Sequence, residues 1–266
     1  MLGAIIGDIV GSRFEWNNYR AKDFEFYHPK CEFTDDSIMT LAIAEAILRE
    51  KGSMKKLSRE TRHCMHEIGR PYPNSGYGGR FYQWMYSDNM GPYNSFGNGA
   101  AMRVSACGLA ASSMDEAIGL SKAVTEVTHN HPEGIKGAEA TAVAIYMAKA
   151  GCTKDEIRSS ICESYYDIDF TIDEIRDTYK FNETCQDTVP QALEAFFESE
   201  SFEDAIRIAI SVGGDSDTLA AITGSIAEAY YGIPVKLREG AKEYLDERLL
   251  DILERFEKEY PPKIAG

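Results

Sequence analysis

Two short acidic motifs, far apart in the chain, each begin an apolar helical segment. The first is Thr34-Asp35-Asp36 and the second is Asp215-Ser216-Asp217-Thr218. Asp, Ser and Thr side chains cap helices by accepting hydrogen bonds from the free N–H groups of the first turn. Capping needs only one such side chain, whereas each motif places two carboxylates beside an almost uncharged helix, where burying charge is unfavourable. The excess of carboxylates indicates a role beyond capping.

These motifs could form one metal site if the fold brings them together. Four carboxylates in one place repel one another and require either bound protons or a bound cation. Oxygen ligands of this kind suit Mg²⁺, Mn²⁺ or Ca²⁺ and do not suit the thiolate and imidazole chemistry of a zinc site. Because two such motifs occur in one chain, we favour a metal site over two independent caps.

Two further segments could bind a substrate. Ser95-Phe96-Gly97-Asn98-Gly99 precedes an apolar stretch, and its glycines would let backbone amides hold a phosphate at a helix N-terminus. A simple tight turn explains the same residues. His129 follows Thr128 in a loop between two expected helices, where an imidazole either contacts a ligand or serves as an ordinary surface or capping group.

Two acids near the N-terminus are also candidates. Asp8 interrupts an apolar run, and Glu15 follows at the start of an irregular segment. A partly buried acid there is either a salt-bridge partner or a general acid or base, and the residues alone favour the salt bridge.

Helical periodicity dominates the elements that must position these groups. No segment alternates with period two beside a hairpin turn, so we predict an all-α fold in a single domain, residues 1–266. Segments 16–33 and 69–98 are irregular and rich in aromatic residues, Gly, Asn and Pro, which is typical of functional loops. N-caps are expected at Ser113, Thr153, Thr171 and Ser201, and helices at 36–50, 54–68, 114–128, 134–150, 154–165, 189–198, 202–212, 216–231 and 234–260.

Composition excludes several classes of protein. The 266 residues include 28 Lys and Arg against 43 Asp and Glu, a net charge of −15 that argues against general nucleic-acid binding but not against a small phosphate-bearing ligand. No apolar run approaches the roughly 18 residues of a membrane-spanning helix. The six cysteines are scattered without a C-x-x-C pair, and the N-terminus is a poor signal peptide, so we expect reduced thiols and a cytoplasmic location.

Taken together, the motifs resemble the ADP-ribosylglycohydrolase family, which includes dinitrogenase-reductase-activating glycohydrolase and the ADP-ribosylhydrolases. The resemblance runs from Leu2 to Gly232 in the family's order. It consists of GAIIGDIVGSRFE, FTDDS, SFGNGAAMR, Thr128-His129 and GGDSDT. The TDD and GGDSDT pair is its most specific part.

The resemblance implies an all-α orthogonal bundle with two divalent cations, Mg²⁺ or Mn²⁺, at the base of a cleft. It implies that Glu15 corresponds to an acid with a catalytic role in some members and that His129 contacts ADP-ribose. The aromatic residues of 16–27 and 72–93 are candidates for stacking on adenine. Transferred by position, the metal ligands are Thr34, Asp35, Asp36, Asp215, Asp217 and Thr218, and the substrate-binding residues are Ser95, Phe96, Gly97, Asn98, Gly99 and His129.

The implied activity is hydrolysis of the glycosidic bond between ADP-ribose and an acceptor, either a protein side chain or a small molecule. Either Glu15 or Asp36 would be the acid or base. Alternatives are a catalytically silent ADP-ribose-binding or nucleotide-binding protein, a crystallin-like structural protein, and a metal-dependent phosphohydrolase that would release phosphate. The acceptor, the choice between Mg²⁺ and Mn²⁺, and the oligomeric state stay open.

Overall fold

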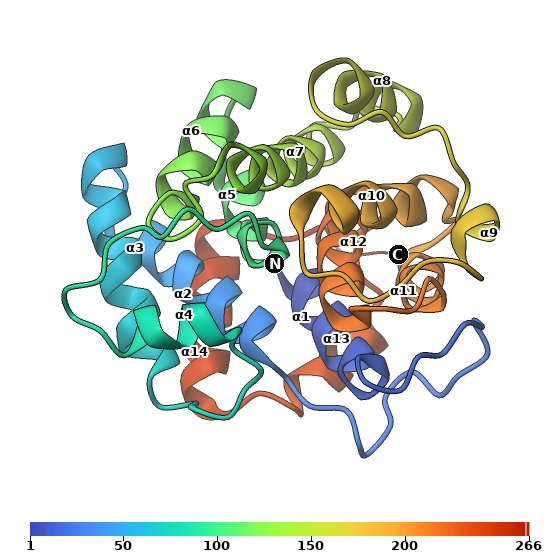
Figure 1. Ribbon diagram of the computed structural model, residues 1–266, viewed down its shortest axis with the longest axis horizontal. Helices are drawn as coiled ribbons and strands as arrows, with labels where there is room; N and C mark the ends of the chain where they lie inside the picture. Colours follow the sequence, from blue (N-terminus) through green and yellow to red (C-terminus); the bar gives the residue numbers. More distant parts are fainter. Residues whose placement is uncertain (264, 266) are drawn as a thin grey trace.

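α-Helices, joined by loops and short 3-10 turns, form the protein in this computed structural model, which describes residues 1–263 and 265 (Figure 1). Within those residues there is no strand, only an antiparallel bridge between Gly97 and Thr184. The predicted all-α class is confirmed. The helices are α1 (Leu2–Gly11), α2 (Asp35–Arg49), α3 (Met54–Gly69), α4 (Gly79–Met85), α5 (Ser105–Ala110), α6 (Met114–Thr125), α7 (Pro132–Lys149), α8 (Lys154–Ser164), α9 (Ile172–Ile175), α10 (Val189–Glu198), α11 (Phe202–Ser211), α12 (Ser216–Tyr231), α13 (Val235–Lys242) and α14 (Glu247–Glu259).

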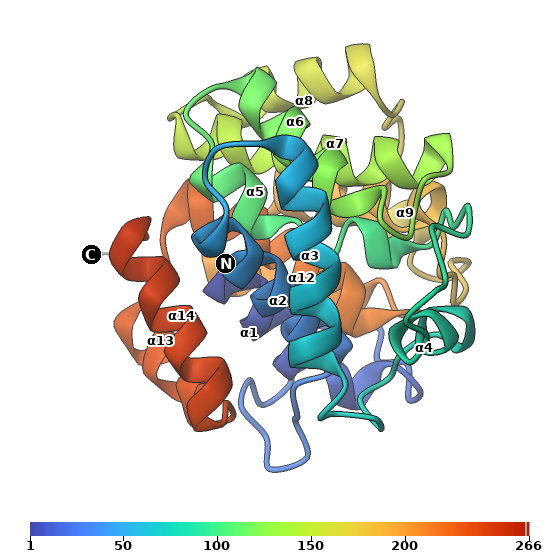
Figure 2. The same ribbon diagram turned by 90° about the vertical axis from the view of Figure 1, so that its left-hand side faces the viewer.

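The antiparallel pair of α1 and α12 lies at the centre of the bundle (Figures 1 and 2). Glycines on one face of α1 let the two backbones touch, since a Cβ added at Gly7 would stand 2.1 Å from the Ala220 carbonyl oxygen. At the next turn, a Cβ on Gly11 would stand 2.5 Å from the Cα of Asp217. The end of α1 is therefore fixed beside the start of α12. Because α1 is buried on all sides, it lacks the polar face by which periodicity reveals a surface helix.

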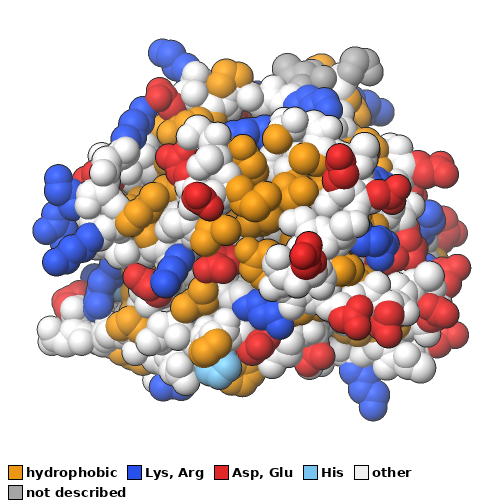
Figure 3. All heavy atoms as spheres, turned by 90° about the horizontal axis from the view of Figure 1, so that it is seen from above, with side chains coloured by type: hydrophobic (Ala, Val, Ile, Leu, Met, Phe, Trp, Pro, Cys, Tyr) orange, Lys and Arg blue, Asp and Glu red, His pale blue; other side chains and the backbone are white. Residues whose placement is uncertain are grey.

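The remaining helices surround this pair. α2, α3 and α14 lie on one side, α10 and α11 lie on the other, and α6 to α8 cover the top in the view of Figure 1. Figure 3 looks onto that top, where apolar side chains gather in the middle and acidic side chains lie toward the right-hand side. No helix in the described part of the chain has both the length and the apolar character needed to cross a membrane. All six cysteines carry free thiols, as predicted.

The predicted helix starts agree closely with the structure. Each of the four expected caps accepts a hydrogen bond from a backbone N–H of its first turn, and α8 and α9 both carry a full capping box. α7 begins two residues earlier than predicted because Pro132 occupies its first position, where the missing N–H has no cost.

Two predictions about the elements are wrong. Segment 234–260 is two helices rather than one, because the Asp246 side chain accepts a hydrogen bond from Leu249 N at 3.0 Å and starts α14 anew. Segment 69–98 is not wholly irregular, since it contains α4, which buries Phe81, Trp84 and Met85 against the core.

Candidate active site and metal centre

One cavity of about 410 Å³ collects nearly all of the residues singled out in the sequence. Its lining falls into two groups, an acidic wall and a turn wall. The acidic wall consists of Glu15, Asp35, Asp36, Asp215, Asp217 and Thr218. The turn wall consists of Ser95, Phe96, Gly97, Asn98, Gly99, Arg103 and His129. Thr34 is the one predicted ligand that does not line the cavity.

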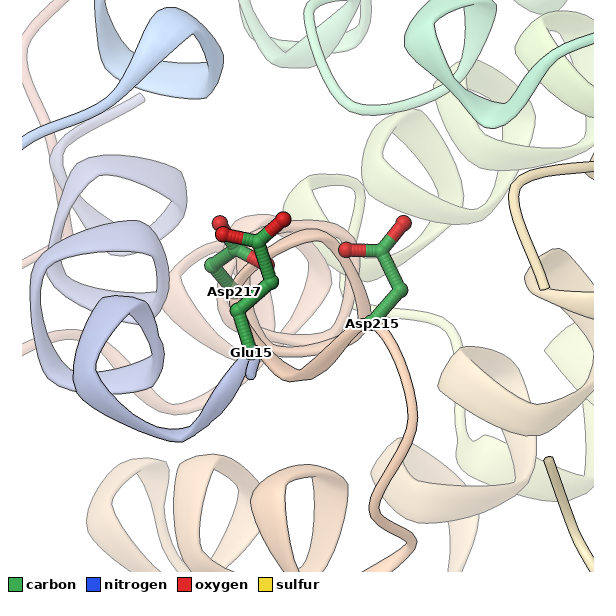
Figure 4. Close-up of side chains that lie close together, drawn as sticks. All are labelled: Glu15, Asp215 and Asp217. Carbon is green, nitrogen blue, oxygen red and sulfur yellow. The ribbon is translucent and has the colours of Figure 1, made fainter. Parts of the chain in front are cut away.

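The acidic wall is built from the ends of three helices. Glu15 follows the 3-10 turn after α1, and Asp215 and Asp217 stand at the start of α12. One carboxylate oxygen from each of these three lies within 4.8 Å of the others, and Figure 4 shows the three carboxyl groups on the same side of the first turn of α12. The α1–α12 contact thus positions this part of the wall.

Asp8 positions the other acidic motif. This residue is fully buried, and its carboxylate accepts hydrogen bonds from Thr34 N at 2.9 Å, Thr34 Oγ1 at 2.6 Å and Ser37 N at 3.0 Å. Asp8, which lies in α1, therefore caps the N-terminus of α2. This contact fixes the orientation of the first turn of α2, which carries Asp35 and Asp36. Thr34 is the N-cap of α2.

The structure brings the two motifs into contact. The Thr218 hydroxyl donates to Asp36 Oδ2 at 3.2 Å, which joins the start of α12 to the start of α2. Asp36 Oδ1 and Asp217 Oδ1 are buried and have no hydrogen-bond partner among the residues described. Two orphaned carboxylate oxygens inside one cavity are an unfavourable arrangement that a bound cation would satisfy.

Charge repulsion in the acidic wall is severe. Burial and the charges of Asp8 and Asp217 raise the pKa of Asp36 well above its usual range. Burial, with the charges of Asp217 and Asp8, raises the pKa of Glu15 to about 8, and burial raises that of Asp215 to about 6. No Lys or Arg within the described ranges forms an ion pair with any of these acids.

Two interpretations from the sequence need correction here. Neither Asp8 nor Glu15 is a salt-bridge partner, because Asp8 serves as a helix cap and Glu15 lines the cavity. The oxygen-only, uncompensated donor set fits divalent cations such as Mg²⁺ or Mn²⁺.

The glycine segment of the turn wall is not the start of a regular helix. It forms a 3-10 turn, Asn98–Ala100, and α5 begins only at Ser105. The turn is tied to a second segment of chain, since Asn98 N donates to Glu183 O at 2.7 Å and Cys185 N donates to Phe96 O at 2.9 Å. The expected helix N-terminus is therefore absent, and a phosphate would meet a fixed turn instead.

Asn98 also joins the two walls. Its side-chain amide donates to Asp215 Oδ2 at 2.6 Å and to Thr188 Oγ1 at 3.2 Å. Its backbone N–H is already used, and Gly97 N donates to Ser95 Oγ at 3.2 Å. Of the three residues of the Gly97-Asn98-Gly99 turn, only Gly99 keeps its backbone N–H without an acceptor in the described chain.

Comparison with known proteins identifies the fold and the family. The sequence model of a family described as ADP-ribosylglycohydrolase matches residues 1–264. The chain belongs to the ADP-ribosylglycohydrolase family. This membership confirms the predicted family and the predicted class of enzyme, a glycosidic-bond hydrolase.

Named relatives agree with this assignment. ADP-ribosylarginine hydrolase Tri1 of Pseudomonas putida (strain GB-1) is 26% identical over 88% of this chain and 70% of its own length. ADP-ribosylhydrolase ARH3 of Xenopus tropicalis is 25% identical over 92% of this chain and 91% of its own length. A solved structure described as an ADP-ribosylglycohydrolase-related protein complex shares the fold, with a TM-score of 0.65, 22% identity and coverage of 97% of this chain and 91% of that one.

The aromatic candidates fall into two groups, those that line the cavity and those that do not. Phe81 and Tyr93 from segment 72–93 line the cavity, as does the half-exposed Phe96. Trp16 does not, and instead its ring stacks on Phe181 with 5.1 Å between centroids.

Arg103 and Glu183 contribute to the site and were not predicted from the sequence, and Asp8 was a candidate whose role was predicted wrongly. Asp8 acts through the fold rather than through spacing, so its interruption of an apolar run was the only signal. Arg103 ends the SFGNGAAMR motif, yet nothing in the sequence indicates that its guanidinium is buried beside His129. Glu183 lines the cavity from a loop without any recognisable motif.

Proposed function

We propose that this protein hydrolyses the glycosidic bond between the distal ribose of ADP-ribose and an acceptor, with two divalent cations at the acidic wall. One observation carries the proposal: five carboxylates from the ends of three helices line one cavity without a basic partner within the residues described. Such a set is unfavourable in a purely structural or crystallin-like protein.

The proposed ligands are the oxygen donors of both motifs. Asp36 Oδ1 and Asp217 Oδ1 are buried and unpartnered, which makes them the first candidates. When bound, the cations would orient ribose hydroxyls and lower the pKa of a water molecule. The full proposed set is Asp35, Asp36, Asp215, Asp217 and Thr218, together with Thr34, which lies outside the cavity lining and whose hydroxyl donates to Asp8.

Glu15 is the proposed proton-transfer group. It is half-buried in the cavity, and burial together with the charges of Asp217 and Asp8 raises its pKa to about 8 in the cation-free protein. Cleavage of the bond at ribose C1 develops positive charge on the ribose, which the neighbouring carboxylates stabilise. As water forms its bond to C1 and the bond to the acceptor breaks, Glu15 takes the proton of the attacking water and passes a proton to the leaving atom.

Asp36 is the alternative acid or base. Its Oδ2 already accepts from Thr218, and the residue is almost fully buried, so it is better placed as a ligand than as a proton carrier. Glu15→Gln and Asp36→Asn separate the two roles. The proton-transfer residue should alter the pH profile of kcat, whereas the ligand should alter the cation requirement.

The turn wall is the proposed site for the rest of ADP-ribose. The free N–H of Gly99 and the ring of His129 offer donors to the pyrophosphate, and the exposed ring of Phe96 offers a stacking surface for adenine. Ser95 and Gly97 shape the turn, and Asn98 holds Asp215 in place.

A panel of ADP-ribosylated substrates tests the proposal, with free ADP-ribose scored in Mg²⁺, Mn²⁺ and EDTA. The name of the Tri1 relative makes an arginine linkage the first to try, followed by serine, nucleic-acid base and small-metabolite linkages. Cation-dependent release of ADP-ribose supports a hydrolase. Release of inorganic phosphate points to a phosphohydrolase instead, and tight binding without turnover points to a silent binder.

A further inference from the structure

Arg103 is a buried cation without an acidic partner. Its side chain is fully buried, its Nε and Nη1 have no hydrogen-bond partner, and no carboxylate in the described chain forms an ion pair with it. Burial lowers the pKa of Arg103 only to about 10, so the group is charged at neutral pH. Because an unpaired buried charge is strongly unfavourable, its retention calls for a function.

The polar groups that Arg103 contacts are Thr128 and His129, and its guanidinium also lies over the Phe81 ring, with Cζ 5.8 Å from the ring centroid. Arg103 Nη2 donates to Thr128 Oγ1 at 2.7 Å and lies 3.4 Å from His129 Nδ1. Thr128 Oγ1 lies 2.7 Å from the same Nδ1. These contacts form a short chain from the guanidinium through the hydroxyl to the ring.

The chemistry of the donors sets the direction of this chain. A guanidinium can only donate, so the Thr128 hydroxyl accepts from Arg103. The hydroxyl contacts no other acceptor within the described residues, and its own proton therefore points to His129 Nδ1. Nδ1 must accept, which leaves the ring neutral with its proton on Nε2.

The opposite edge of the ring faces the turn wall. A Cβ built on Gly97 would stand 3.5 Å from His129 Nε2, and one built on Gly99 would stand 3.4 Å from it. No described residue accepts a hydrogen bond from Nε2, although the ring lines the cavity. Burial and the Arg103 charge hold the pKa of His129 well below its usual range, in keeping with a neutral ring.

We infer that Arg103 and Thr128 are positioning residues that lock His129 as the neutral Nε2–H tautomer, presenting one donor to a ligand oxygen at the Gly97–Gly99 turn. The identity of that oxygen, in the pyrophosphate or a ribose of ADP-ribose, rests on the proposed function. The tautomer does not.

The direct test is ¹⁵N NMR of the histidine side chains in the ligand-free protein at pH 7, with His129 assigned by its loss in His129→Asn. The expected pattern is an unprotonated Nδ1 and a protonated Nε2. An imidazolium ring or a protonated Nδ1 overturns the inference, whatever the variants below do.

Substitution of Arg103 tests the cause of this tautomer. In Arg103→Met the Thr128 hydroxyl is free to accept from the ring, so both tautomers should be populated and ADP-ribose binding should weaken about tenfold, as for the loss of one oriented hydrogen bond. Arg103→Lys keeps a charged donor and should restore the single tautomer, and Thr128→Ser keeps the hydroxyl and should match the wild type. An unchanged tautomer in Arg103→Met overturns the role of Arg103.

The two proposals fail separately. The spectrum of the ligand-free protein does not depend on turnover, so a wrong tautomer contradicts this inference alone. Absence of hydrolysis with the expected spectrum contradicts the proposed function and leaves the inference intact.

Discussion

The two walls of the cavity carry uncompensated charge of opposite sign, but they differ in how their hydrogen bonds are completed. On the acidic wall, carboxylates with raised pKa values face one another, and Asp36 and Asp217 keep oxygens without a partner. On the turn wall, Arg103 and His129 are joined through Thr128 into an ordered chain of donors and acceptors.

The turn wall is therefore the one that is already ordered without a ligand, although Arg103 Nε and Nη1 keep no hydrogen-bond partner. Because the hydrogen bonds of the turn wall form before a ligand binds, substitutions there should disrupt an arrangement that already exists. The acidic wall is incomplete until positive charge arrives, so removing one of its acids should relieve strain in the cation-free protein while destroying activity. Stability and function are thus predicted to move in opposite directions on the acidic wall.

The largest expected effect is loss of turnover in Asp35→Ala and Asp217→Ala. Each removes a proposed ligand, and we expect kcat/KM to fall by at least about 10³-fold. In EDTA the melting temperature of either variant should equal or exceed that of the wild type, because repulsion is relieved.

Initial rates in Mn²⁺ and Mg²⁺, together with thermal melting, check this prediction. Asp169→Ala, at an exposed acid outside the cavity, is the matched control and should behave as the wild type. Wild-type rates in Asp35→Ala or Asp217→Ala would remove the metal-dependent account.

The next effect concerns the helix contact that places half of the acidic wall. A Cβ at Gly7 would stand 2.1 Å from the Ala220 carbonyl oxygen, so Gly7→Ala must push α1 from α12. We expect a loss of about 2–4 kcal/mol in the free energy of unfolding, measured by urea denaturation, together with reduced turnover. Gly91→Ala, where nothing lies within 4 Å, serves as the control and should cost little.

A smaller effect is the pH dependence of stability without cations. A carboxyl whose pKa is raised in the folded state binds more protons there than when unfolded, so stability falls as pH rises toward the folded pKa. With Glu15 near 8, the melting temperature in EDTA should decrease between about pH 6.5 and 8.5. His66 and His129, whose pKa values are lowered, are neutral in the folded protein across this window. In the unfolded chain they titrate at about pH 6.5, so above about pH 7.5 they no longer oppose the Glu15 slope.

Thermal melting from pH 6.5 upward, with and without Mn²⁺, measures this slope. Glu15→Gln should flatten it in EDTA, and saturating Mn²⁺ should flatten it in the wild type. A slope that is identical in all three samples would show that Glu15 does not carry a raised pKa.

The smallest expected effect concerns the aromatic residue of the turn wall. Phe96→Ala should raise KM about three- to tenfold with little change in kcat, because a stacking surface for adenine is lost. Trp16→Ala should leave KM unchanged, since Trp16 lies outside the cavity lining. Steady-state kinetics of the two variants distinguish the two possible adenine sites. A raised KM in Trp16→Ala with an unchanged KM in Phe96→Ala would place adenine at the Trp16–Phe181 pair instead.

Sequence was sufficient for features that local rules control. The caps at Ser113, Thr153, Thr171 and Ser201 depend on bonds within one turn, and they were found at the predicted residues. The two acidic motifs were recognisable because each contains more carboxylates than a cap requires.

Contacts between residues far apart in the chain could not be predicted from the spacing of residues in the sequence. Asp8 caps a helix that starts 27 positions later, and Arg103 meets His129 across a similar separation. The break at Asp246 was hidden because apolar periodicity continues through it. The single domain and the cytoplasmic location stay predictions.

The proposed function depends above all on two divalent cations bound at the acidic wall. Anomalous diffraction from crystals soaked in Mn²⁺ tests it most directly, with Asp217→Ala crystals as the comparison. We expect two manganese peaks among Asp35, Asp36, Asp215 and Asp217 in the wild type and the loss of at least one in the variant. The absence of manganese from this wall, or peaks there that the substitution leaves unchanged, would contradict it.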